Sequence, residues 1–183
     1  MADAEVESVI AATRHWLERA VIGLNLCPFA RTVFSENRIR YYVSAARTAD
    51  ELLADLDIEL RRLQAADPAE CETTLLIHPH TLADFLDYND FLDLGDATLD
   101  ALDLIDEIQI ASFHPDYQFA DTAPDAIENY TNRSPYPMLH LLREASVARA
   151  VASVPNTATI YEANITTLRR LGAQGWRRLW LSV

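Results

Sequence analysis

The feature that most constrains this chain is the alternation of short β-rich runs with helical patterns. Residues 38–44, 73–77 and 108–113 are rich in aliphatic, aromatic and β-branched residues, which is typical of strands. Longer segments with apolar residues at helical spacing separate these runs. Strands that alternate with helices favour right-handed crossovers and a layered fold. The sequence therefore predicts an α/β or α+β fold, in which helices flank a small sheet of three to four strands.

Capping and breaking residues mark the ends of the expected helices. These signals are Gly23 after the first helix, the capping box Thr48 and Glu51 and the breaker Asp67-Pro68 around the second, Thr81 before the third, and Gly172 after the last. The acidic, leucine-rich stretch 91–106 predicts one or two more helices. Further helices are expected over 137–152, where proline lies near the start, and over 157–171. The tail 176–181 is expected to pack on the core.

Length and charge limit the number of domains and the kinds of partner. The chain has 183 residues, half of them hydrophobic, which suits a single globular domain over 1–183. Its 28 acidic and 15 basic residues give a net charge of -13. Such a chain repels the phosphates of nucleic acids and of anionic membranes. We therefore expect no nucleic acid and no membrane partner; the sequence indicates no oligomeric state.

Cysteine content and the first residues indicate the compartment. The chain has two cysteines, Cys27 and Cys71, too few for a disulfide framework. Residues 1–9 carry acids where a secretory signal carries Lys or Arg. No apolar run approaches the roughly 20 residues that span a bilayer. These features together predict a cytoplasmic protein.

A long segment without helical or strand periodicity, residues 114–136, follows the third predicted strand. Connections of this length are often functional or disordered. Several aromatic residues and three prolines favour an ordered loop here. Open parallel sheets usually bind ligands at the carboxyl ends of their strands. We therefore expect the functional surface to centre on residues 114–143.

Polar residues in and beside this loop are candidates for binding a ligand. The candidates are Asn25, Tyr117, Asn129, Asn132, Arg133, Ser134 and Arg143. An arginine near a helix N-terminus is a good receptor for carboxylate or phosphate, so we expect a small anionic molecule as the ligand. Two alternatives stay open. Asn129 and Asn132 can instead stabilise turns, and the two arginines can pair with nearby acids.

Cys27, His114 and His140 are the candidate catalytic residues. Cys27 precedes Pro28, which fits an N-cap followed by the first residue of a helix. A helix N-terminus favours the nucleophilic thiolate, and His114 or His140 could act as its base. The alternative interpretation is that Cys27 is a small buried hydrophobic residue.

The spacing of the histidines raises a metal site as an alternative. On the helix expected here, His140 and Glu144 lie four residues apart on one face. Together with His114 they could hold a transition metal, although a surface ion pair explains the same spacing. His78 and His80 would point the same way on an extended chain and form a secondary candidate.

Several cofactor signatures are missing from the sequence. With four glycines the chain cannot hold a Rossmann fingerprint, and it has no glycine-rich phosphate loop, G-x-S-x-G elbow or H-E-x-x-H motif. We therefore expect no Rossmann-type or P-loop nucleotide site. The candidate transition metal is the one cofactor that the sequence suggests.

Three runs carry a resemblance to a known family. They are NLCPFA (25–30), ASFHPDYQFA (111–120) and NYTNRSPYPMLHLLRE (129–144). Together they resemble a family of proteins of unknown function, and the match spans most of the chain. That family has no established activity, so the resemblance implies kinship without a mechanism. It also implies that the three runs belong to one shared site.

Three functions are compatible with these observations. The leading hypothesis is a small-molecule enzyme in which the two arginines hold an anionic group while the cysteine and histidines supply nucleophilic or acid–base chemistry. The second is a metal-dependent enzyme that uses His114, His140 and Glu144. The third is a noncatalytic protein-binding or regulatory module whose contact surface includes Tyr117 and Tyr130 together with Tyr136.

Overall fold

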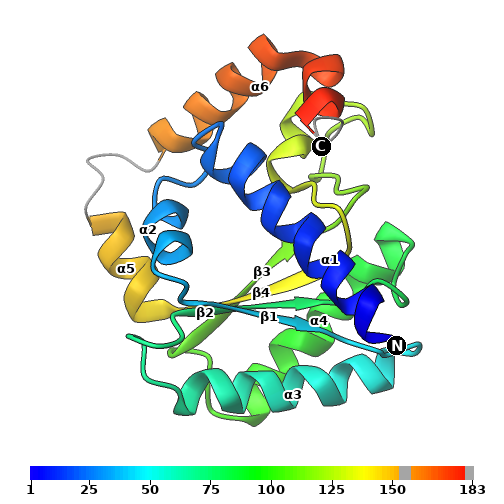
Figure 1. The fold of residues 1–183 in the computed structure, drawn as a ribbon, viewed down its shortest axis with the longest axis vertical. Helices are drawn as coiled ribbons and strands as arrows, with labels where there is room; N and C mark the ends of the chain where they lie inside the picture. Colours follow the sequence, from blue (N-terminus) through cyan, green and yellow to red (C-terminus); the bar gives the residue numbers. More distant parts are fainter. Residues whose placement is uncertain (153–157, 180–183) are drawn as a thin grey trace.

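The computed structural model describes residues 1–152 and 158–179 (Figure 1). The helices are α1 (Asp3–Trp16), the π-helical segment η1 (Leu17–Ile22), α2 (Ala30–Ser35), α3 (Ala49–Ala65), α4 (Phe85–Ala101), the 3-10 helix η2 (Ile127–Asn132), α5 (Glu144–Ala152) and α6 (Ala158–Leu179). The strands are β1 (Ile39–Val43), β2 (Thr73–Ile77), β3 (Ile108–Phe113) and β4 (Met138–Arg143). All three strands predicted from the sequence are present, and β4 is a fourth.

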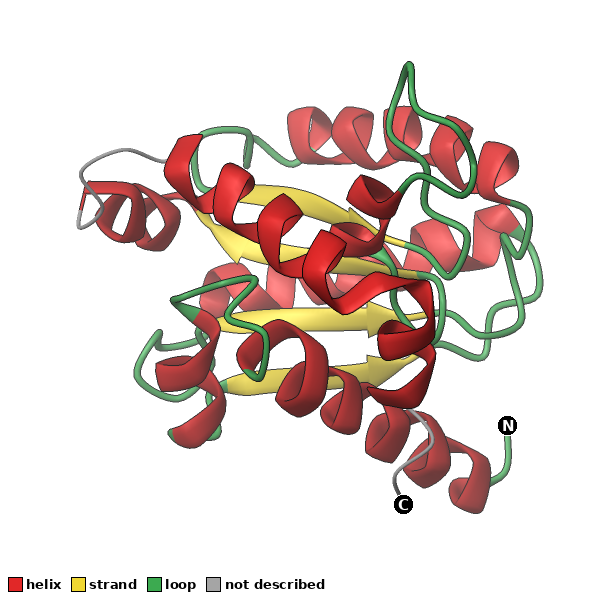
Figure 2. Cartoon of the chain, turned by 90° about the horizontal axis from the view of Figure 1, so that it is seen from above, coloured by secondary structure: helices red, strands yellow, loops and turns green. Residues whose placement is uncertain are grey.

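The strands form one mixed sheet in the order β1-β2-β4-β3. β1 and β2 are parallel, whereas β4 lies between β2 and β3 and is antiparallel to both (Figure 2). β1, β2 and β3 therefore run in the same direction, and their carboxyl ends meet at one edge of the sheet. Helices flank this sheet, so the predicted α+β arrangement is confirmed.

Helices cover both faces of the sheet and form two hydrophobic cores. On one face lie α3 and α4, whose core includes Leu56, Leu60 and Tyr88. On the other face lie α1, η1 and α2, with α6 packed outside them (Figure 1). Trp16 and Met138 are buried in this second core. Because both faces are covered, the two central strands, β2 and β4, have buried residues of either parity.

The prediction of a helix over 137–152 is wrong in its first half. Residues 138–143 form β4, and only 144–152 are helical. Met138, Leu139 and Leu141 are completely buried, each against one of the two cores. A strand covered on both faces has a nearly continuous apolar sequence, which periodicity cannot distinguish from a buried helix.

Most of the predicted helix boundaries are confirmed. The Thr48 hydroxyl accepts a hydrogen bond from the Glu51 backbone N–H, and α3 ends before Asp67-Pro68. The prediction that Thr81 caps the next helix is wrong, because the Asp84 carboxylate accepts the bonds from the first turn of α4. That helix continues into the acidic stretch as a single element and ends at Ala101.

The C-terminal helix changes direction at Gly172. Its φ of 65° is left-handed, which glycine adopts without strain, so the predicted stop is a kink within α6. Beyond the kink, Trp176 packs edge-on against Tyr130, as expected for a docked tail. The rest of that predicted tail, residues 180–181, lies outside the described residues. No helix in the described part of the chain combines the length and the apolar character needed to cross a membrane.

Candidate functional site

An apolar cavity lies on the sheet face that α1, η1 and α2 cover; we call it the sheet pocket. It has a volume of about 350 Å³. All four strands contribute to its lining, with Leu75 of β2, His140 of β4 and Ala111 of β3 in register across the sheet. Trp16 and Cys27 contribute to its walls, and residues 146–151 of α5 close one side. A small apolar cavity with few polar groups is a typical ligand site.

His140 is the central polar group of the sheet pocket. Its ring lies 6.1 Å from the ring of Phe113, measured between centroids, and forms no hydrogen bond with any described residue. Burial lowers the pKa of His140 to about 4. The imidazole is therefore neutral at pH 7 and offers one N–H donor and one nitrogen acceptor to a molecule in the pocket.

Cys27 lines the same pocket from the loop between η1 and α2. The prediction that it caps a helix is wrong. The N-cap of α2 is Phe29, and Cys27 and Pro28 lie in the preceding turn. The loop is held in place by backbone bonds from Leu26 and Cys27 to the Val21 carbonyl and by the Asn164 side chain of α6, which donates to the Leu26 carbonyl.

Asn25 and Asn129 have local structural roles. Asn25 adopts a left-handed φ of 56° in the turn before Cys27. Asn129 is buried, and its side chain accepts from the Phe119 N–H and donates to the Ala123 carbonyl. These bonds fold the loop upon itself.

Asn132 and Tyr117 also hold the loop against the rest of the fold. Asn132 donates its side-chain N–H to the Ser112 carbonyl in β3. The Tyr117 ring packs against the rings of Phe85 and Phe119, with centroids 5.2 Å and 5.0 Å away. The 114–136 segment is therefore ordered, as its composition predicts.

His114 lies on the opposite face of the sheet from His140. It is completely buried, and burial lowers its pKa. Its Nε2 lies 3.2 Å from the Leu82 carbonyl, to which it can only donate, and its Nδ1 accepts from the Asp116 backbone N–H at 3.0 Å. Both ring nitrogens of His114 are therefore occupied by backbone groups. His114 lines neither the sheet pocket nor the groove described below.

The sequence interpretation missed a polar cluster around Tyr88, next to His114. The Tyr88 hydroxyl donates to the Met138 carbonyl and accepts from the Phe113 N–H, so it joins the ends of β4 and β3. The His78 ring stacks on Tyr88, donates from Nδ1 to the Thr81 carbonyl, and has a buried Nε2 without a partner. Burial lowers the pKa of His78 to about 4. The sequence feature that could have identified Tyr88 as buried is its position in the apolar stripe of α4.

The histidine sets proposed for a metal do not assemble. His140 lies on β4 and not on a helix with Glu144, because the chain changes from strand to helix between them. His78 and His80 lie in a turn, closed by the bond from the Thr81 N–H to the His78 carbonyl, and not on an extended chain; His78 is buried, and His80 pairs with Glu5 at 2.8 Å. Over residues 1–152 and 158–179, no three His, Cys, Asp or Glu side chains are grouped to hold a metal ion.

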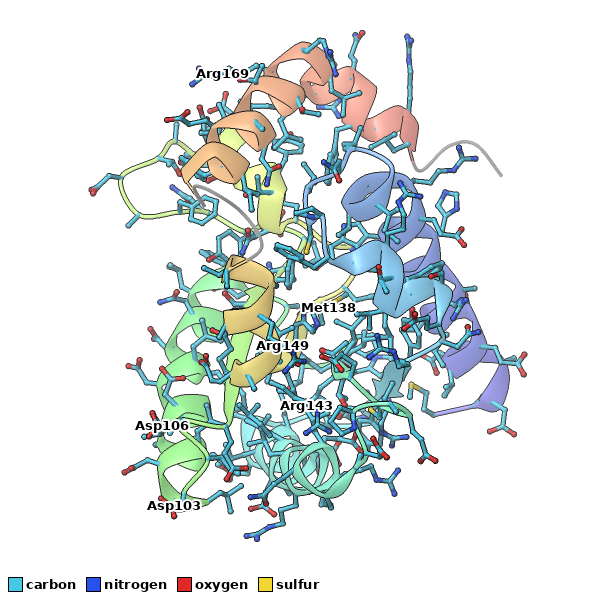
Figure 3. All side chains as sticks on the ribbon, turned by 90° about the vertical axis from the view of Figure 1, so that its left-hand side faces the viewer. Asp103, Asp106, Met138, Arg143, Arg149 and Arg169 are labelled. Atoms are coloured by element: carbon cyan, nitrogen blue, oxygen red, sulfur yellow. The ribbon has the colours of Figure 1, made fainter. Side chains whose placement is uncertain are left out.

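Arg143 is tied to the end of α3. One of its terminal nitrogens, Nη2, donates to the carbonyls of Leu63, Ala66 and Cys71 at 2.7–3.2 Å. Figure 3 shows Arg143 beside the teal α3 helix. The guanidinium thus caps a helix C-terminus, where a cation is favourable, and it precedes α5 instead of lying inside a helix. Its buried Nε has no partner.

Arg133 and Ser134 line a second, larger cavity that we call the α1–α6 groove. It has a volume of about 860 Å³ and lies between α1, the end of the long loop and the last turns of α6. Arg133 donates to the Pro124 and Tyr117 carbonyls, and the Ser134 hydroxyl donates to the Tyr136 carbonyl. Trp16 separates the two cavities: its ring lines the sheet pocket, and its indole N–H donates to the Arg133 carbonyl.

The candidate residues therefore divide among three places. Cys27, His140 and Arg143 line the sheet pocket, Arg133 lines the α1–α6 groove, and His114 lies under the sheet. The expected common site of Cys27, His114 and Arg133 is not formed as a single cavity. Strand parity decides this, because β4 directs His140 toward the cysteine, whereas His114, which follows Phe113 at the end of β3, lies on the opposite face.

These features define an α+β protein with a mixed four-stranded sheet and a ligand-sized pocket on one sheet face. The chain belongs to the family described as protein of unknown function (DUF1415), whose family model matches residues 8–178. The resemblance inferred from the three sequence runs is thereby confirmed as membership of a family without assigned function. No curated protein and no solved structure is similar to the chain.

Proposed function

We propose that this protein is a small-molecule enzyme whose ligand lies in the sheet pocket, with Cys27 and His140 as the reacting groups. The observation that supports this most is that a thiol and an unpartnered imidazole, from segments far apart in the sequence, line one enclosed cavity. Ordinary core packing leaves few polar side chains without a partner beside empty space. A ligand would supply the missing hydrogen bond to His140.

The surroundings of the two groups limit the chemistry. Because the pKa of His140 is lowered to about 4, the imidazole acts as a neutral hydrogen-bonding group or as a proton acceptor at pH 7. It can take the proton of the Cys27 thiol as the sulfur adds to a carbonyl carbon of the ligand, and the electron pair of the C=O double bond then moves onto the carbonyl oxygen. The nearby Trp16 and Leu75 suit a compact ligand with an apolar body.

The test is selective alkylation of the native protein with N-ethylmaleimide, followed residue by residue with mass spectrometry. Cys71 is the matched control, because it is the other free cysteine and packs in the opposite core. In His140→Gln we expect the labelling rate of Cys27 to fall by about tenfold or more, with the Cys71 rate unchanged. Equal rates of Cys27 labelling in both proteins would refute the thiol–imidazole pair.

A second measurement tests ligand binding separately from reactivity. A fragment library is screened for compounds that protect Cys27, but not Cys71, from alkylation. Ala111→Leu places a larger side chain on the pocket floor, so a compound that binds there should lose its protective effect in this variant. If no compound protects Cys27, or if protection survives in Ala111→Leu, the ligand site is elsewhere.

The other proposals from the sequence receive less support. Tyr130 is buried against Trp176, which disfavours an aromatic contact surface built on the loop tyrosines. A bound metal would need ligands beyond the three residues suggested for it. Two unpaired cysteines suit the reducing cytoplasm, where we propose that the enzyme acts.

A further inference from the structure

The α1–α6 groove has walls from three separate parts of the chain. On α1, the small residues Ser8, Ala11 and Ala12 face it at helical spacing and leave space. Arg133 comes from the long loop and Arg177 from the end of α6. These three segments are also joined by contacts, because Tyr130 of the loop packs edge-on against Trp176 at a centroid distance of 5.3 Å.

The charge of the groove is opposite to that of the whole chain. The net charge is -13, yet the side chains that line the groove include Arg133, Arg177 and His15 and no Asp or Glu. Glu7, next to Ser8 on α1, does not line the groove, and two further acids on these elements have other partners. Glu5 of α1 pairs with His80 at 2.8 Å, and Glu128 of η2 pairs with Arg169 at 2.6 Å.

The Arg133 guanidinium is positioned by neutral groups. Its Nη2 donates to the Pro124 carbonyl at 2.6 Å and its Nε to the Tyr117 carbonyl at 3.4 Å. Its carbon atom Cζ lies 4.3 Å from the centre of the Tyr130 ring. None of these partners carries a negative charge, and Nη1 bonds to no described residue. The charge is therefore fixed in place without being neutralised.

Arg177 supplies a second cation at the groove. Its side chain is exposed, and it forms no ion pair with a described carboxylate. Ser8 adds a hydroxyl that can donate to an oxyanion. Planar guanidinium groups bind the oxygens of carboxylates and phosphates in pairs, so two of them facing one groove match a compact oxyanion.

We infer that the α1–α6 groove is a binding site for a small molecule that carries a phosphate or a carboxylate group, with Arg133 and Arg177 as its receptors. This site is distinct from the sheet pocket, and the inference does not depend on the proposed function. It also agrees with the anionic ligand that we expected from the sequence. The second arginine of the site is then Arg177 and not Arg143.

The experiment is isothermal titration calorimetry of the full chain with two probes, inorganic phosphate and malonate, at constant ionic strength set with sodium chloride. We compare the unmodified protein with Arg177→Gln and with Arg170→Gln as the matched control. Arg170 lies on the same helix, is exposed, and does not line the groove. Circular dichroism establishes that each variant keeps the fold.

We expect saturable binding of at least one probe, with the affinity about tenfold lower in Arg177→Gln and changed less than about twofold in Arg170→Gln. The probe that binds more tightly identifies phosphate or carboxylate as the anion. Binding should be unchanged in Cys27→Ser, which keeps this test separate from the sheet pocket. No saturable binding of either probe, or equal losses in the two arginine variants, would overturn the inference.

Discussion

His140 lies in β4 and His114 directly follows the neighbouring strand β3, but their surroundings differ completely. His114 follows β3 on the α4 face, is completely buried, and has both ring nitrogens bonded to the backbone. His140 lies within β4 on the α1 face, lines the sheet pocket, and has no hydrogen bond to a described residue. The comparison teaches that hydrogen-bond satisfaction, more than burial or a shifted pKa, separates a structural histidine from one available to a ligand.

The largest expected effect is the loss of stability in His114→Ala. This variant removes a buried ring and leaves the Leu82 carbonyl and the Asp116 N–H without their partner. We expect the free energy of unfolding to fall by about 3–5 kcal/mol, measured by urea denaturation. His140→Ala is the control, and its cost should be about 1 kcal/mol or less, because no hydrogen bond is broken. A similar cost for both variants would remove the distinction between them.

Much of the fold could be predicted from the sequence, and β4 shows why the rest could not. The runs that form β1, β2 and β3 were identified by composition, and Thr48 marked the start of α3 through local chemistry. β4 is apolar at nearly every position because it is covered on both faces, so its period is hidden. His140 is the one polar residue in the apolar run from Met138 to Leu142. It could have indicated a site, but the sequence interpretation placed it on the face of a helix.

The candidate site depends on pairing that no local pattern encodes. Cys27 and His140 were both chosen from the sequence, and they do line one pocket. The other residues of the site could not be chosen correctly from the sequence. Which side chains share a face of the sheet depends on the antiparallel position of β4 between β2 and β3. Arg143 illustrates the limit, since its role depends on the α3 carbonyls that the fold brings to it.

The next effect is a loss of stability at acid pH, and it extends the comparison to His78. One ring nitrogen of His78 is hydrogen-bonded and the other has no partner. Its folded pKa of about 4 lies below the unfolded value of about 6.5, so the unfolded chain binds the proton more strongly. Its contribution to stability is present above pH 6.5 and is lost as the pH falls toward 4. The expected loss between pH 7.5 and 4.5 is on the order of 2–3 kcal/mol from this group.

Urea denaturation at the two pH values measures this effect in the unmodified protein and in His78→Asn. The asparagine amide can still donate to the Thr81 carbonyl but does not titrate, so the variant should lose less stability on acidification. The difference between the two proteins isolates this histidine from the many carboxylates. If both proteins lose the same stability, protonation of His78 does not oppose folding.

The smallest effect, and the sharpest test of the comparison, is His140→Phe. Phenylalanine has a similar shape and needs no hydrogen bond, and the ring would lie among Phe113, Leu75 and Ala111. Replacing an unsatisfied polar group by an apolar one removes its desolvation cost, so we expect the free energy of unfolding to stay within about 1 kcal/mol or to rise. The midpoint of urea denaturation at pH 7.5 measures it.

A loss of more than about 2 kcal/mol would mean that His140 has a partner in the folded protein, and its role would then be structural like that of His114. If His140→Phe is as stable as the unmodified protein but Cys27 is no longer alkylated faster than Cys71, the fold does not need His140. Its role would then be in the chemistry of the sheet pocket.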